Sequence, residues 1–302
     1  MNLASYKAGN QFKTFILVAA LTGLLLGIGV LLGGMGGLLL FAGFAVVFNF
    51  AMYWFSGKMA LKMSKAVEVS EDEEPELHRM IERLAQRAGV PKPGVYVTPA
   101  EQPNAFATGR NPSHAAIAVT KGIQSALGPR ELEGVIAHEM AHIKNRDILI
   151  ASIAAMVAGA ISAIANFLQF SLIFGGDDDN PLGVIGTIAM AIMAPLAAAI
   201  IQMAISRQRE YVADATGAEL LGDPMPLADA LGALQRGADA IPMKVNQSAA
   251  PLFIVNPLAS NARANARGGG RMGRLFSTHP PMEERVERLH RMAGQSMVIR
   301  SF

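Results

Sequence analysis

The sequence predicts an α+β membrane protein: four transmembrane helices in two hairpins, attached to a mainly helical domain with a small β-sheet. Three observations support this fold class. First, 51% of the 302 residues are hydrophobic and only 17% are charged, whereas about 25% is usual for soluble domains. Second, nearly all charges fall in residues 58–147 and 206–302. Third, both segments contain helical patterns, and the first also contains two short β-type runs.

Four apolar stretches are long enough to cross a bilayer, which requires about 20 residues. The first pair is separated only by Gly33 and Gly34, and the run continues too far for a signal peptide. A buried core helix is the alternative interpretation for each stretch. The four stretches are Thr14–Leu32, Met35–Phe55, Ile148–Phe174 and Leu182–Ile205.

The positive residues near these stretches predict their orientation. Lysines and arginines flank the outer ends of both predicted hairpins, whereas the two short links within the hairpins carry none. By the positive-inside rule, both termini and both polar segments are cytoplasmic. The expected organisation is a hairpin at 1–57, a first domain segment at 58–147, a second hairpin at 148–205 and a second domain segment at 206–302.

The polar segments contain recognisable local elements. Residues 102–114 form a turn-rich link between two β-type runs, and residues 256–274 are rich in Asn, Arg and Gly and are expected to form a loop. His78, His114 and His290 have no motif around them and are expected at the surface. The predicted helices are Glu74–Ala88, Arg130–Asn145, Arg207–Leu221, Leu227–Leu234 and Pro281–Met292, and the predicted strands are Gly94–Thr98 and Ala115–Thr120.

The composition also restricts the chemistry. A net charge of +2 disfavours a nucleic-acid-binding protein. The chain has no cysteine, which excludes disulfides, cysteine nucleophiles and thiolate metal sites. Any bound metal must therefore be held by histidine and carboxylate groups.

The motif with the strongest chemical implication is His138-Glu139-Met140-Ala141-His142. Residues four apart lie on one helix face, so both imidazoles can reach one zinc ion, while Glu139 beside them can accept a proton from a water. The alternative is a helix with two histidines of no chemical role.

A third ligand is expected from a remote carboxylate, because the metzincin continuation fails: Ile148 stands where that family has histidine. Glu210 and Asp214 are again four residues apart, so one can bind metal while the other orients a ligand histidine. Two apolar stretches separate His142 from Glu210, and an even number of crossings returns the chain to the same side at a similar depth. Solvated charges on a surface helix are the alternative.

Taken together, these features resemble the HtpX-type integral-membrane zinc metalloproteases over nearly the whole chain. The resemblance rests on the N-terminal apolar hairpin and on residues 104–109, 138–142, 206–214 and 277–280. It implies a cytoplasmic zincin-like protease domain with one Zn²⁺ per chain, bound by His138, His142 and Glu210, with Glu139 as general base. It further implies an endopeptidase of the bacterial inner membrane that cleaves unfolded or misassembled membrane proteins during stress and quality control.

Four further residues are weaker candidates for the site. The resemblance brings Asn104 and His279 near it as transition-state donors, although Asn104 is also typical of a turn and His279 of a residue preceding a helix. Arg207 is expected to pair with Asp214 or Glu139, or to be only a charge flanking the membrane. An exposed edge at Ala115–Thr120 could pair with an extended peptide substrate.

Three other functions are compatible with parts of the sequence. A CAAX-type prenyl-peptide protease shares the zinc motifs but usually has more spans. A transporter needs more polar residues inside its spans than this chain offers. A non-catalytic membrane scaffold with a structural metal site would not require Glu139. The sequence does not identify natural substrates, oligomeric state or other protein partners.

Overall fold

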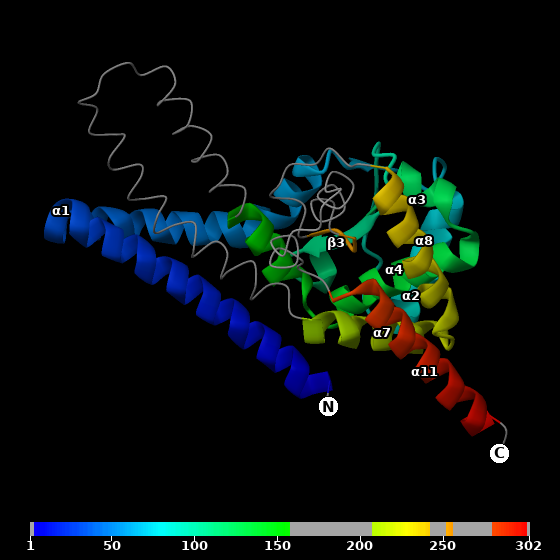
Figure 1. Ribbon diagram of the computed structural model, residues 1–302. Helices are drawn as coiled ribbons and strands as arrows, with labels where there is room; N and C mark the ends of the chain where they lie inside the picture. The colour runs from blue at the N-terminus through cyan, green and yellow to red at the C-terminus, as the bar shows by residue number, and fades with distance from the viewer. Residues whose placement is uncertain (1–2, 158–206, 242–251, 256–279, 301–302) are drawn as a thin grey trace, which may run out of the picture.

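The computed structural model describes residues 3–157, 207–241, 252–255 and 280–300. The described residues form two parts, a long helical hairpin and a domain in which helices surround a small sheet (Figure 1). The fourth predicted apolar stretch and most of the third lie outside these residues.

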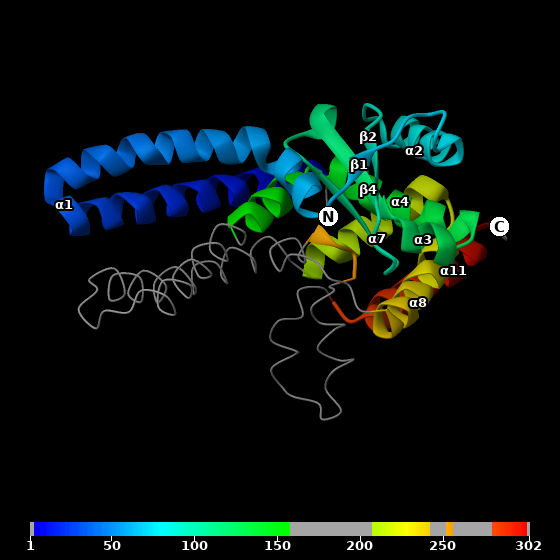
Figure 2. The same cartoon turned by 90° about the horizontal axis from the view of Figure 1, so that it is seen from above.

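The hairpin is helix α1, Leu3–Met63, which reverses direction at Gly33 and Gly34. Gly34 has φ of 56° and ψ of −133°, a conformation that essentially only glycine adopts. The two arms lie side by side (Figure 2), and the Asn49 Nδ2 donates a hydrogen bond to the Thr22 Oγ1 at 2.7 Å. The turn therefore falls at the two glycines between the first two predicted apolar stretches.

The second arm of α1 has the properties of a membrane span. Among the described residues, Gly33–Met63 is the one helix long and apolar enough to cross a membrane, while Thr14–Gly27 and Ile148–Val157 are shorter apolar helices. Large side chains on this arm face outward: Leu39 is 68% exposed and Val46 is 71% exposed. These side chains need an apolar environment outside the described chain.

The sheet contains four strands in the order β1-β2-β4-β3. Strands β2 and β4 are parallel, whereas β1 pairs antiparallel with β2 and β3 pairs antiparallel with β4. The strands are β1 Val67–Glu68, β2 Gly94–Thr98, β3 Ala105–Gly109 and β4 Ala115–Thr120.

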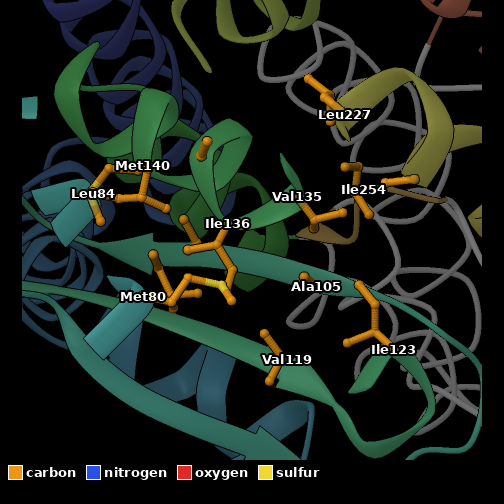
Figure 3. Packing of buried hydrophobic residues seen from close by; sticks show 14 of the residues in the cluster. Met80, Leu84, Ala105, Val119, Ile123, Val135, Ile136, Met140, Leu227 and Ile254 are labelled. Atoms are coloured by element: carbon orange, nitrogen blue, oxygen red, sulfur yellow. The ribbon is translucent and has the colours of Figure 1, made fainter. Parts of the chain in front are cut away.

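The helices of the domain are built around α4, Pro129–Lys144, which contains the HExxH motif. Its apolar side chains Val135, Ile136 and Met140 are fully buried between the sheet and the neighbouring helices (Figure 3). The other described elements are η1 Pro112–His114, α2 Pro75–Ala88, α3 Lys121–Ala126, α7 Arg207–Leu221, α8 Met225–Ala240 and α11 Met282–Arg300.

Two expectations about the sheet were wrong. The link at 102–114 contains the strand β3, which the short Ala105–Gly109 segment did not signal because all five of its residues are buried and no alternation is visible. Strand β4 is central, with β2 on one side and β3 on the other, so the edge of Ala115–Thr120 is not available to a peptide. Helices α8 and α11 are also longer than predicted.

Candidate metal centre

Helix α4 presents the two histidines of the motif on one face. Pro129 occupies its first turn, and the Glu131 carboxylate accepts a hydrogen bond from the Gly128 amide at 2.8 Å, which caps the helix start. The Nε2 atoms of His138 and His142 lie 3.2 Å apart. His138 is 1% exposed, and His142 is partly open. The predicted pairing of the two imidazoles is therefore present.

Glu210 reaches these histidines from helix α7. Its two carboxylate oxygens lie 3.6 Å from the His138 Nε2 and 3.7 Å from the His142 Nε2. Helix α7 can approach because Gly217 faces α4: a Cβ there would lie 3.1 Å from the His138 backbone nitrogen. The chain thus brings His138, His142 and Glu210 together from positions up to 72 residues apart.

The dimensions of this group fit a zinc ion. Ligand atoms of the three residues all lie within 4.8 Å of one another. Zinc–nitrogen and zinc–oxygen bonds of about 2.0–2.2 Å in a tetrahedron would separate the ligand atoms by about 3.3–3.5 Å, close to the three separations above. Two imidazoles and one carboxylate are also a donor set typical of catalytic zinc, which keeps a fourth position open.

A second layer of carboxylates orients both imidazoles. The His138 Nδ1 donates to the Asp214 Oδ1 at 2.9 Å, and the His142 Nδ1 donates to the Asp147 Oδ2 at 3.1 Å. Arg209 approaches the other Asp147 oxygen at 3.5 Å. Because these hydrogen bonds keep a proton on each Nδ1, the Nε2 atoms are the ones directed at the common centre, an arrangement usual for histidine ligands of metals.

Arg285, on helix α11, completes the site and was missed by the sequence analysis. Its guanidinium binds both oxygens of Asp214, at 2.9 Å from Nε and 2.6 Å from Nη2, and it is fully buried. A signal was available: Met282, Arg285 and Leu289 share one face of α11, so Arg285 occupies an apolar position of an amphipathic helix. A buried arginine at such a position requires a carboxylate partner.

The charged groups of this cluster stabilise one another's charged forms. Burial alone would lower the pKa of His138, but its hydrogen bonds to Asp214 and Glu210 raise that pKa to about 9. Burial would raise the pKa of the Asp214 carboxyl, but the Arg285 guanidinium holds it below its usual value. A metal at the His138 Nε2 must therefore displace a proton that the carboxylates favour.

Glu139 follows His138 on α4 and is 3% exposed. Its carboxylate is close enough to the cluster to act electrostatically on the Arg285 guanidinium, and its role as a general base stays a prediction. Asp147, like Arg285, was not anticipated: it follows the end of α4, where Arg146 adopts a positive φ of 61° and returns the carboxylate toward His142.

The remaining predicted site residues are placed differently. Arg207 is exposed, and Asp214, one of the two partners expected for it, is bound by Arg285 instead. This agrees with the alternative of a charge flanking the membrane. Asn104 is buried, and its side chain binds the backbone of Val255 through Nδ2 at 2.8 Å and Oδ1 at 3.2 Å. His279 lies outside the described residues. His78, expected at the surface, is buried with its Nε2 3.0 Å from the Val69 carbonyl oxygen.

Comparison with known proteins agrees with this geometry. The family model described as Peptidase family M48 matches residues 71–293, which include α4, α7 and most of α11. The chain belongs to peptidase family M48. Two curated relatives of this M48 chain are named Protease HtpX homolog: that of Persephonella marina is 53% identical over 94% of this chain and 98% of its own length, and that of Pyrococcus furiosus is 49% identical over 96% and 99%.

A solved structure shows that the fold is shared more widely. The crystal structure of S. mikatae Ste24p matches this M48 chain with a TM-score of 0.50 at 20% sequence identity, covering 95% of this chain and 67% of that one. At this identity the likeness concerns the fold alone. The shared fold covers most of this chain.

Proposed function

We propose that this chain is a membrane-anchored, zinc-dependent endopeptidase that cleaves misfolded or damaged membrane proteins at the cytoplasmic face of a bacterial inner membrane. The observation that carries the proposal is the convergence of the His138 and His142 Nε2 atoms on the Glu210 carboxylate. Glu139, next to His138 in the same helix, is buried. The names of the curated relatives support proteolysis as the activity.

In the proposed reaction, each of the residues around the centre has a separate task. When bound, zinc supplies Lewis-acid chemistry, lowering the pKa of a water and polarising the carbonyl of the peptide bond. The Glu139 carboxylate accepts the proton of the attacking water and returns it to the departing amine. Asp214 and Asp147 keep the two imidazoles in the Nδ1–H form, and Arg285 balances the charge of Asp214.

The membrane part of the proposal rests on the surface of α1. Apolar side chains of the second arm are exposed along its length, and lysines follow at positions 58, 62 and 65. This order is typical of a span that ends on the cytoplasmic side. Anchoring would place the domain beside membrane-protein substrates, which suits quality control and a stress response.

The decisive experiment compares the full-length protein with Glu139→Gln on an unfolded protein substrate in detergent with zinc. We expect Glu139→Gln to lower turnover at least about 100-fold, the usual contribution of a general base, while zinc content stays near one per chain. Glu210→Ala should lose zinc. Glu133→Gln is a matched control, because this carboxylate on the same helix binds Arg83 at the surface.

Four results would contradict the proposal. Equal cleavage by the parent and Glu139→Gln would exclude the mechanism, and absence of zinc from the purified parent would exclude the site. Activity confined to prenylated peptides would favour a CAAX-type protease. Zinc binding without cleavage of any substrate would favour a scaffold with a structural metal.

A further inference from the structure

A pocket lies away from the metal centre, where the end of α1 meets the sheet. Its volume is about 190 Å³. Four residues on one face of α1, spaced three and four apart, contribute to it: Trp54, Gly57, Lys58 and Leu61. The strands and the turn after β3 supply the rest of the lining: Gly94, Tyr96, Thr108, Gly109, Arg110, His114, Ala115 and Ala116.

The helix and the sheet are in direct contact beside this pocket. A Cβ added to Gly57 would lie 3.0 Å from the Gly109 Cα, so only glycine allows α1 to pack this closely on the end of β3. The light-blue end of α1 meets the sheet there in Figure 2. The close packing of α1 on β3 therefore fixes the walls of the pocket.

The pocket is positively charged. Among the described residues that line it are Lys58, Arg110 and His114, and there is no Asp or Glu. Within the described part of the chain, neither Lys58 nor Arg110 forms an ion pair with a carboxylate. Glu68 is the register partner of Tyr96, and its carboxylate interacts with the Tyr96 hydroxyl rather than with Lys58 or Arg110. Two cations that pair with no carboxylate among the described residues attract an anion.

Arg110 is also oriented for such a ligand. Its guanidinium carbon lies 4.2 Å from the centre of the Trp54 ring. Stacking of this kind occupies the flat face of the guanidinium and leaves its N–H edge free, which is the edge that binds phosphate oxygens in pairs.

The pocket and the metal centre lie on opposite faces of the sheet. Alternate residues of a strand point to opposite faces. Val95, Ile117 and Val119 pack in the core with α4, whereas Tyr96, Ala116 and Ala118 pack with the end of α1. A ligand in this pocket would therefore not compete with a peptide at the metal centre.

The position of the pocket identifies the source of the anion. The lining residue Trp54 and its neighbour Phe55 are exposed at 41% and 51% at the end of the apolar arm, and an aromatic residue followed by lysine is typical of the level of lipid headgroups. We propose that this pocket binds the phosphate of an anionic phospholipid headgroup and so fixes the domain against the bilayer. This inference goes beyond the proposed peptidase activity and does not depend on it.

The test uses Trp54, the only tryptophan of the chain, as a reporter. Full-length protein in detergent is titrated with dihexanoyl phosphatidylglycerol, with dihexanoyl phosphatidylcholine and with inorganic phosphate, and Trp54 fluorescence is followed. Native mass spectrometry of the lipid adducts gives a second readout that does not require a fluorescence change. We expect saturable binding of phosphatidylglycerol and at least fivefold weaker binding of phosphatidylcholine.

Variants separate the pocket from general surface charge. Lys58→Gln and Arg110→Gln should each weaken phosphatidylglycerol binding about fivefold or more, the factor expected for one cation near a headgroup. Lys62→Gln removes an equal charge one turn along α1, outside the lining, and should change binding less than twofold. Cleavage of the unfolded substrate by Lys58→Gln should equal that of the parent.

Each contrary outcome overturns a defined part of the inference. Equal binding of the two lipids, or equal effects of Lys62→Gln and Arg110→Gln, would exclude a headgroup site. Saturable binding of inorganic phosphate without lipid binding would make the pocket a site for soluble phosphate. Failure of the parent protein to bind phosphatidylglycerol would exclude the headgroup site, while its cleavage of the unfolded substrate would leave the proposed peptidase function intact.

Discussion

At the residue scale, the metal centre depends on charges that are balanced in pairs. The three proposed ligands cannot hold their geometry alone, because each imidazole must keep its proton on Nδ1. Asp214 and Asp147 provide this, and Arg285 in turn binds Asp214 through two hydrogen bonds. A neutral replacement of Arg285 would leave the carboxylate buried without its cation.

We therefore expect Arg285→Gln to weaken zinc binding or turnover about 10–100-fold, the range for residues that support metal ligands. It should also lower the free energy of unfolding by about 3–5 kcal/mol, as for a broken buried ion pair. Zinc titration and thermal unfolding of the detergent-solubilised protein measure both effects.

The matched control for this prediction is Arg288→Gln, one turn away on α11. Arg288 lies on the surface, where it pairs with Glu284 and stacks on Tyr211. Its loss should cost no more than about 1 kcal/mol and should leave zinc binding unchanged. Equal behaviour of the two variants would show that Arg285 does not support the centre.

At the element scale, the site requires α4 to lie very close to its neighbours. Gly217 sets the distance to α7, and Gly134 sets the distance to α8: a Cβ on Gly134 would lie 2.7 Å from the Leu227 backbone nitrogen. This close packing of the helices sets the positions of His138 and His142 relative to Glu210. Backbone contacts of this kind cannot relax by a change of side-chain rotamer.

Gly134→Ala should therefore destabilise the protein by about 1–3 kcal/mol through overpacking. The contrasting variant is Gly232→Ala on α8, where a Cβ would meet only the end of the Arg236 side chain at 3.5 Å. There the better helix propensity of alanine should stabilise by up to about 1 kcal/mol. Thermal unfolding of both variants measures these changes in stability. Unchanged stability of Gly134→Ala would contradict the close packing of α4 on α8.

At the scale of the whole molecule, the apolar hairpin and the charged domain have surfaces suited to different surroundings. The exposed apolar side chains of α1 need an apolar environment, which the proposed membrane anchoring would supply, whereas the charged helices of the domain need water. The proposed orientation places the turn at Gly33 and Gly34 on the side of the membrane opposite the domain.

Because the chain has no cysteine, single cysteines can report this orientation without background. Met35→Cys, at the turn of α1, should react with a membrane-impermeant maleimide added to intact bacterial spheroplasts. Glu76→Cys, exposed on α2, should react only after the membrane is permeabilised. Labelling of Glu76→Cys before the membrane is permeabilised would contradict the proposed orientation.

The sequence alone determined the features that depend on local patterns. The HExxH helix, the glycine break between the first two apolar stretches, strands β2 and β4 and the course of α2 follow from spacing within a few residues. The separation of charged from apolar segments is likewise readable along the chain, because lipid and water select side chains by composition.

Only the tertiary structure decided which groups complete the site and the sheet. Arg285 lies 71 positions from Asp214 and 147 from His138, and no local pattern links them. The tertiary structure also shows that β4 is a central strand and that residues 105–109 form the strand β3. Asp214 pairs with Arg285 and not with Arg207. Such pairings arise when distant helix faces are buried together, and burial then requires each charge to find an opposite one.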